Sequence, residues 1–106
     1  MDERAFEGLA ARMLADLADR LEDSLGDAAE VELRGGILTI DCAGGGQFVV
    51  NKHAPNREIW LSSPVSGATH FARRGEEWVS TRGTDRFAER LAADLADATG
   101  VRVDLG

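Results

Sequence analysis

The chain has 106 residues, enough for a single domain over residues 1–106 with a core that needs no disulfide or structural metal. Nineteen acidic against twelve basic residues give a formal net charge of −7, which disfavours binding to nucleic acids and to anionic membranes. No apolar run is long enough for a membrane span or a signal peptide, and the single cysteine excludes an internal disulfide, so the composition fits a cytoplasmic protein.

The first predicted element is an amphipathic helix over residues 2–25. Its apolar residues recur at spacings of three and four and predict one buried stripe, made of Phe6, Leu9, Met13, Leu17 and Leu21. Asp2 is placed to cap the start of this helix, and Gly26 is placed to end it.

From residue 30 the hydrophobic period changes to two, which predicts strands joined by short turns. The predicted strands are Glu30–Arg34, Ile37–Cys42, Gln47–Lys52, Arg57–Ser63, Thr69–Ala72 and Glu77–Thr81. A second helix is predicted over residues 84–98, with Thr84 or Asp85 as its cap, and Val101–Leu105 could add a last strand. This order predicts an α+β fold, a two-layer sandwich with both helices packed on one face of a mainly antiparallel sheet.

The clearest sign of a binding surface is a tryptophan in the middle of the chain. The alternation places Ile59 and Leu61 in the core and therefore turns Trp60 towards the sheet face that two helices would leave bare. By the same parity, Asn51 shares this outer face. The pattern leaves two interpretations open, namely an anchor for a partner protein or partial burial under the loop after Pro64.

Carboxylates gather along the first helix and the start of the first strand. Three of them lie within about 60° on the helix and three follow it: Asp16, Asp19 and Asp23, then Asp27, Glu30 and Glu32. If the strand lies beside the helix, these oxygens form an acidic ridge suited to hard cations held at modest affinity. The alternative is a solvated helix face, partly neutralised by Arg12 and Arg20.

The residues alone indicate no catalytic constellation. Ser62 and Ser63 lack a nucleophile-elbow motif, and the glycine run 44–46 lacks the ending of a phosphate-binding loop. His53 and His70 are far apart in sequence, and each is interpreted as a polar surface residue rather than as a ligand. Cys42 alternates in phase with its buried neighbours and Trp78 lies in a short strand, so we expect both in the core.

Four stretches of the chain resemble the frataxin family, and within it the bacterial iron-donor members. They are the acidic end of the first helix at Arg20–Asp23, then Glu32–Ile40, Asn51–Pro64 and Ser66–Gly67. The stretch Asn51–Pro64, reading NKHAPNREIWLSSP, is the most specific of the four, and the order of elements agrees from end to end.

This resemblance implies a role in iron–sulfur cluster assembly. It implies weak binding of ferrous and ferric iron without an organic cofactor, docking on the complex of cysteine desulfurase and scaffold protein, and a monomer that could oligomerise with iron. The implied iron ligands are Asp16, Asp19, Glu22, Asp23, Asp27, Glu30 and Glu32. The implied partner-binding residues are Asn51, His53, Trp60 and His70. A ferroxidase or iron-storage protein is the alternative function.

Overall fold

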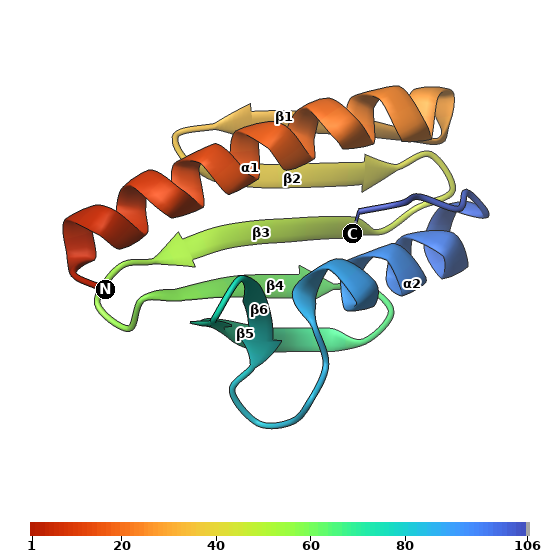
Figure 1. Cartoon of the computed structure of the whole chain (residues 1–106). Coiled ribbons are helices and arrows are strands. Elements are labelled where there is room, and N and C mark those ends of the chain that lie inside the picture. Colours follow the sequence, from red (N-terminus) through yellow and green to blue (C-terminus); the bar gives the residue numbers. More distant parts are fainter. Residues whose placement is uncertain (106) are drawn as a thin grey trace.

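Two helices lie across one face of a six-stranded antiparallel sheet in the computed structural model, which describes residues 1–105 (Figure 1). The elements in chain order are α1 (Glu3–Leu25), the short 3-10 helix η1 (Gly26–Ala28), β1 (Ala29–Arg34), β2 (Ile37–Cys42), β3 (Gln47–His53), β4 (Glu58–Ser63), β5 (Gly67–Arg74), β6 (Glu77–Ser80) and α2 (Phe87–Thr99). Each strand pairs with the next one in the chain, in the spatial order β1 to β6. The predicted two-layer α+β sandwich is confirmed.

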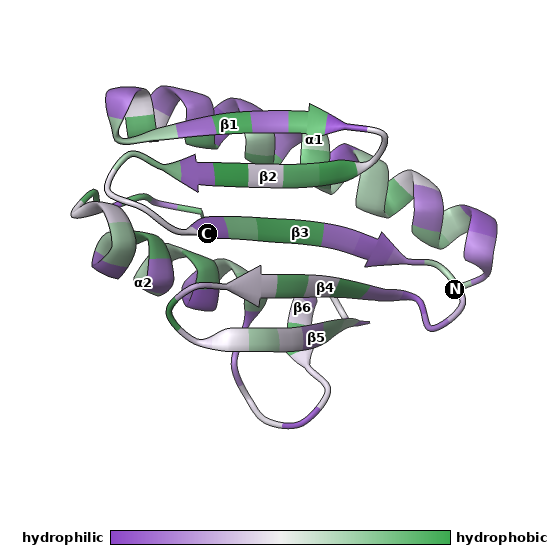
Figure 2. Cartoon of the chain, turned by 180° about the vertical axis from the view of Figure 1, so that it is seen from behind, coloured by the Kyte–Doolittle hydropathy of each residue, from purple (hydrophilic) through white to green (hydrophobic). Residues whose placement is uncertain are grey.

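The core fills the space between the sheet and the helices. Alternate residues of the central strands point towards the helices and are buried, because a strand turns successive side chains to opposite faces. The largest fully buried side chains are Phe6, Leu14, Leu21, Leu38, Ile40, Phe48, Val50, Ile59, Leu61, Phe71, Leu91 and Leu95. The other face of the sheet has no helix across it in the described chain (Figure 2). No helix within residues 1–105 combines the length and apolar character needed to cross a membrane.

Helix α1 begins and ends where the sequence predicts. The Asp2 carboxylate accepts a hydrogen bond of 2.7 Å from the backbone N–H of Ala5, and Gly26 ends the helix with a positive φ of 52°. The predicted apolar stripe is partly wrong. Leu9 and Met13 are only half-buried at the margin of the core, because Ala10 and Leu14 occupy the helix face that packs against the sheet.

Two predictions for the C-terminal part of the chain are wrong. Neither Thr84 nor Asp85 caps α2, because the helix begins at Phe87 and Asp85 is held elsewhere. The Asp85 carbonyl accepts from the Ser80 backbone N–H at 2.8 Å, and its carboxylate pairs with a downstream arginine. The tail after α2 forms no strand over residues 101–105; it runs back between the two helices, where Val103 is buried in the core (Figure 1).

A buried carboxylate ties α2 to the end of β4. Asp94 is 1% exposed and accepts hydrogen bonds from the hydroxyls of Ser63, at 2.7 Å, and Ser66. It also pairs with Arg90 at 3.3 Å, and the Ser63 hydroxyl in turn accepts from the backbone N–H of Val65. Asp94 thereby satisfies a turn that would otherwise leave buried polar groups without partners.

Replacing this carboxylate should destabilise the fold. We expect Asp94→Ala to lower the free energy of unfolding by about 2–4 kcal/mol, since two hydroxyls and one guanidinium lose their acceptor. Urea denaturation measures this change. Asp97→Ala removes an exposed carboxylate from the same helix and should change stability by less than about 0.5 kcal/mol. Equal stabilities for the two variants would contradict a structural role for Asp94.

Candidate functional site

A row of side chains crosses the outer face of the sheet through five strands. Cross-strand pairing joins Arg34 of β1 to Ile37 of β2, Ile37 to Asn51 of β3, Asn51 to Trp60 of β4, and Trp60 to His70 of β5. Directly paired residues point to the same face, so these five form one continuous line. Ile37 is 40% exposed, which is unusual for so large an apolar side chain. We call this line the outer row.

Three aromatic rings are stacked at the β5 end of the outer row. The His53 and Trp60 ring centroids are 4.0 Å apart and the Trp60 and His70 centroids are 4.2 Å apart, with an interplanar angle of 8° in both pairs. Glu58 binds two members of this stack. Its carboxylate accepts the indole N–H of Trp60 at 2.9 Å and lies 3.7 Å from Nδ1 of His70.

The stack determines how Trp60 can meet a partner. Both faces of its indole are covered by imidazoles and its N–H is already donated to Glu58, so a partner can reach only the ring edge. Partial burial of Trp60 therefore comes from the two histidines rather than from the loop after Pro64. The Nδ1 atom of His53 is buried without a hydrogen-bond partner among the described residues.

The strand pairing places two histidines that are far apart in the sequence next to the same tryptophan. His53 and His70 lie on opposite sides of Trp60 because β3 and β5 are the two neighbours of β4 in the sheet. Glu58 was not among the predicted site residues. A usable signal was its position two residues before Trp60, which places both side chains on the same face of β4.

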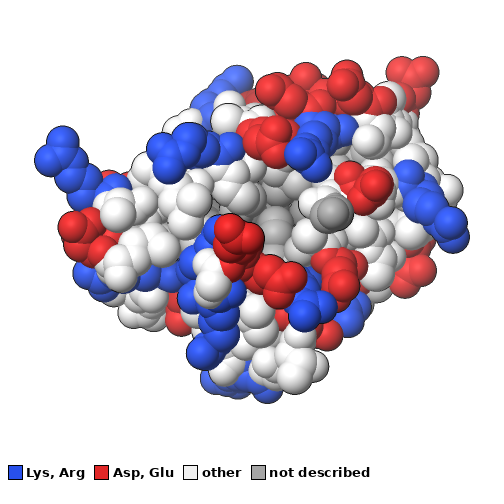
Figure 3. All heavy atoms as spheres, viewed as in Figure 1, with Lys and Arg blue, Asp and Glu red and all other residues white. Residues whose placement is uncertain are grey.

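The predicted acidic residues occupy one edge of the molecule but two different faces. Asp16, Asp19, Glu22 and Asp23 are exposed along α1, and acidic side chains line the upper edge of the molecule in Figure 3. Glu30 and Glu32 lie on the outer face of β1, since Val31 between them points towards the helices and pairs with the buried Ile40. The predicted iron ligands are spread over three elements, with Asp16, Asp19, Glu22 and Asp23 on α1, Asp27 on η1, and Glu30 and Glu32 on β1.

These carboxylates do not converge. No three or more His, Cys, Asp or Glu side chains within residues 1–105 are close enough to form a metal-binding group. Two members of the predicted set are already in ion pairs, Asp16 with Arg20 at 3.0 Å and Glu32 with Arg34 at 3.1 Å. Such a surface can hold cations only with much of their hydration shell retained.

One additional carboxylate adjoins this edge. Asp41 of β2 is the direct cross-strand partner of Glu30, and both line a hollow of about 480 Å³ with Asp27. Like charges placed opposite each other on a sheet repel, and a bound cation would relieve that repulsion. Gln47 partly compensates by donating a hydrogen bond of 2.9 Å to Asp41.

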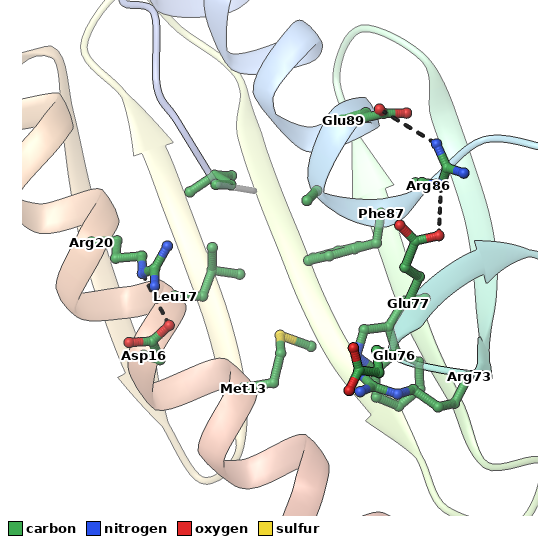
Figure 4. Close-up of a pocket in the computed structure, with 13 residues that line it drawn as sticks. Met13, Asp16, Leu17, Arg20, Arg73, Glu76, Glu77, Arg86, Phe87 and Glu89 are labelled. Carbon is green, nitrogen blue, oxygen red and sulfur yellow. Dashed lines mark hydrogen bonds and ion pairs between the residues drawn. The ribbon is translucent and has the colours of Figure 1, made fainter.

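A groove of about 460 Å³ separates the two helices on the inner side of the molecule (Figure 4). Its floor is apolar, with Leu17 and Phe87 among the lining residues. The charges on its rim neutralise one another, because Arg86 pairs with Glu77 at 2.7 Å and with Glu89 at 3.8 Å. The groove therefore offers a ligand little unpaired charge.

The predicted core positions of Cys42 and Trp78 are confirmed, at 8% and 6% exposure. Burial raises the pKa of the Cys42 thiol above its ordinary value, and the neighbouring Asp41 carboxylate raises the pKa further. A raised thiol pKa keeps the sulfur protonated near neutral pH, which makes Cys42 a poor nucleophile and a poor metal ligand.

Comparison with known proteins decides the family. The family model described as the frataxin-like domain matches residues 1–101. The chain belongs to the frataxin family. It is 30% identical to the iron-sulfur cluster assembly protein CyaY of Neisseria meningitidis over 105 residues, which cover 99% of this chain and 96% of that protein. It is 36% identical over 91 residues to the mitochondrial frataxin homolog of Saccharomyces cerevisiae, covering 78% of this chain and 52% of the yeast protein.

Solved frataxin structures share the fold. A frataxin from Psychromonas ingrahamii superposes with a TM-score of 0.88 at 22% identity and covers 98% of this chain and 97% of its own. Trimeric yeast frataxin complexed with ferrous iron superposes with a TM-score of 0.71 at 31% identity and covers 94% of this chain and 88% of its own. The predicted resemblance to the frataxin family and its bacterial members is therefore confirmed.

The two imidazoles should influence the chemical shift of the Trp60 indole. The rings of His53 and His70 cover both faces of this indole, so removing them changes its magnetic surroundings. We expect the Trp60 indole N–H resonance to move in ¹H–¹⁵N NMR spectra when His53→Gln and His70→Gln are introduced together. The Trp78 indole packs against Phe6 and Arg73, away from this stack, so its resonance is an internal control.

If the Trp60 resonance moves no further than the Trp78 resonance in this double variant, the two histidines do not flank Trp60 in solution.

Proposed function

We propose that this frataxin is an accessory protein of iron–sulfur cluster assembly. It docks on the complex of cysteine desulfurase and scaffold protein through the outer row, and it binds iron as cargo on the acidic edge formed by α1, η1 and β1. The observation that carries this proposal is the bare sheet face with the Trp60 stack at the β5 end of a continuous row. The assignment to this process is supported by the similar Neisseria protein, which is named for iron–sulfur cluster assembly.

The outer row has the composition of a docking surface. It combines an exposed aliphatic side chain, Ile37, with an aromatic stack whose orientation is fixed, so little conformational entropy is lost on binding. The neighbouring line on the same face carries Thr39, Val49 and Ser62, which are small and uncharged, and at its β1 end Glu32, which is paired with Arg34 of the row. A partner can therefore approach the row closely without having to bury an unpaired charge.

Iron binding on the acidic edge follows from charge rather than from a closed coordination site. Five of the predicted ligands make no ion pair with other described residues: Asp19, Glu22, Asp23, Asp27 and Glu30. Hydrated ferrous iron, a cation with affinity for oxygen ligands, would be attracted to these exposed carboxylates and held weakly. The yeast frataxin solved with ferrous iron supports this part of the proposal.

Removing the indole should abolish most of the docking affinity. We expect Trp60→Ala to weaken binding to the purified desulfurase–scaffold complex by at least about thirtyfold, since a central aromatic anchor typically contributes about 2 kcal/mol or more. Calorimetric titration measures this affinity. Val65→Ala trims a side chain that is 45% exposed in the β4–β5 loop, away from the row, and should bind normally. If Trp60→Ala, shown to be folded, docks as tightly as the Val65 variant, the proposed surface is wrong.

Neutralising the acidic edge should weaken iron binding. We expect the triple change Asp19→Asn, Asp23→Asn and Glu30→Gln to reduce ferrous iron affinity about tenfold, at roughly 0.5 kcal/mol for each exposed charge. Anaerobic titration calorimetry measures the affinity. The matched control also removes three exposed carboxylates, replacing Glu76 in the β5–β6 turn and Glu89 and Asp97 of α2 with their amides.

Equal loss of affinity in both variants would show that iron responds only to net charge and would contradict a localised iron surface. Oxygen consumption recorded with the same proteins tests the ferroxidase alternative. Oxidation of ferrous iron no faster than in buffer would remove that alternative.

A further inference from the structure

A small polar hollow lies next to the outer row, where that row ends at β5. It has a volume of about 440 Å³ and is formed between β5 and the loop that joins β6 to α2. His70 belongs both to the ring stack and to this hollow, so the two features are continuous. The lining residues are Ala68, Thr69, His70, Ser80, Thr81, Arg82, Gly83 and Asp85.

Hydrogen bonds hold the loop in place. The Thr81 backbone N–H donates to the His70 carbonyl at 2.9 Å, and the Ser80 N–H donates to the Asp85 carbonyl at 2.8 Å. The Arg82 N–H donates to the hydroxyl of Ser80 at 3.2 Å. The loop therefore closes on itself and on β5, so the hollow exists before any partner arrives.

The hollow contains one arginine, Arg82, whose charge is not balanced by an ion pair within residues 1–105. Arg82 is exposed and forms no ion pair with any residue in the described part of the chain. Asp85 is the one carboxylate of the lining, and it pairs with Arg90 at 3.2 Å. Hydrogen bonding to Asp94 and the charge of Asp85 raise the pKa of the Arg90 guanidinium, and Asp85 forms its ion pair with Arg90 rather than with Arg82.

The remaining lining groups can also donate hydrogen bonds to an anion. Thr69 and Thr81 carry hydroxyls, and the imidazole of His70, whose side chain is 44% exposed, can offer a ring N–H. The Arg82 charge stands out on a chain with a net charge of −7 and favours an acidic group by complementarity.

We propose that this hollow receives an acidic side chain of the protein that docks on the outer row, with Arg82 as the counter-charge. The proposal rests on the proposed docking function and assigns to it a second, electrostatic contact. Trp60 would supply the apolar anchor, and Arg82 would select partners that place a carboxylate next to that anchor.

The test compares two exposed arginines that form no ion pair with other residues within 1–105. Arg82→Gln removes the charge of the hollow, and Arg74→Gln removes the same charge at the far end of β5. We expect Arg82→Gln to weaken binding to the desulfurase–scaffold complex about five- to tenfold and to reduce the salt dependence of the affinity. Arg74→Gln should change the affinity less than about twofold.

Trp60→Ala, measured in the same series, separates the two proposals. If Trp60→Ala loses docking while Arg82→Gln binds like the unmodified chain, the hollow has no role and the docking function stands. If Trp60→Ala docks normally, the docking function itself fails. An NMR titration of the free chain with inorganic phosphate covers the other occupant. Saturable shifts at Thr81, Arg82 and Gly83, together with unchanged docking of Arg82→Gln, would assign the hollow to a free anion and overturn the proposal.

Discussion

The register of β4 between β3 and β5 is the constraint on which both the core and the candidate docking surface depend. It sends Ile59 and Leu61 into the core and turns Trp60 outward between two histidines. A slip by one residue would expose the two aliphatic side chains and bury an indole together with the Glu58 carboxylate, at a cost of several kcal/mol. Burial of Ile59 and Leu61 on the inner face therefore also determines that Trp60 lies on the outer face. No further interaction is needed to select this orientation.

The two layers divide the molecule into regions with different chemistry. The helices cover the inner face completely enough to bury the core, while the exposed side of α1 carries six of the nineteen acidic residues. Asp94 joins α2 to the end of β4, so the helical layer and the strand that carries Trp60 are connected through a buried network. An acidic edge and a sheet face that bears the outer row are consequently available to two kinds of ligand, the proposed cation and the proposed protein partner.

The sequence allowed prediction of most of the fold, because period-two and period-three-to-four patterns report directly on burial. It predicted the outward direction of Trp60 for the same reason. It could not predict that His53 and His70 stack on opposite faces of Trp60, since that arrangement depends on which strands flank β4. The acidic edge shows a second limit. Glu30 and Glu32 lie near α1 in sequence, yet parity turns them to the outer face, away from the carboxylates of that helix. The predicted cap of α2 was wrong because Asp85 is held by a hydrogen bond from Ser80 and by an ion pair with Arg90.

Amide-resolved NMR of the ¹⁵N-labelled chain, titrated with the desulfurase–scaffold complex, tests the central claim most directly. We expect the resonances of Ile37, Asn51, Trp60 and His70 to be the first to shift or broaden, because these residues share one line across the sheet. Perturbations confined to the helical layer of α1 and α2, with the outer row unchanged, would contradict it.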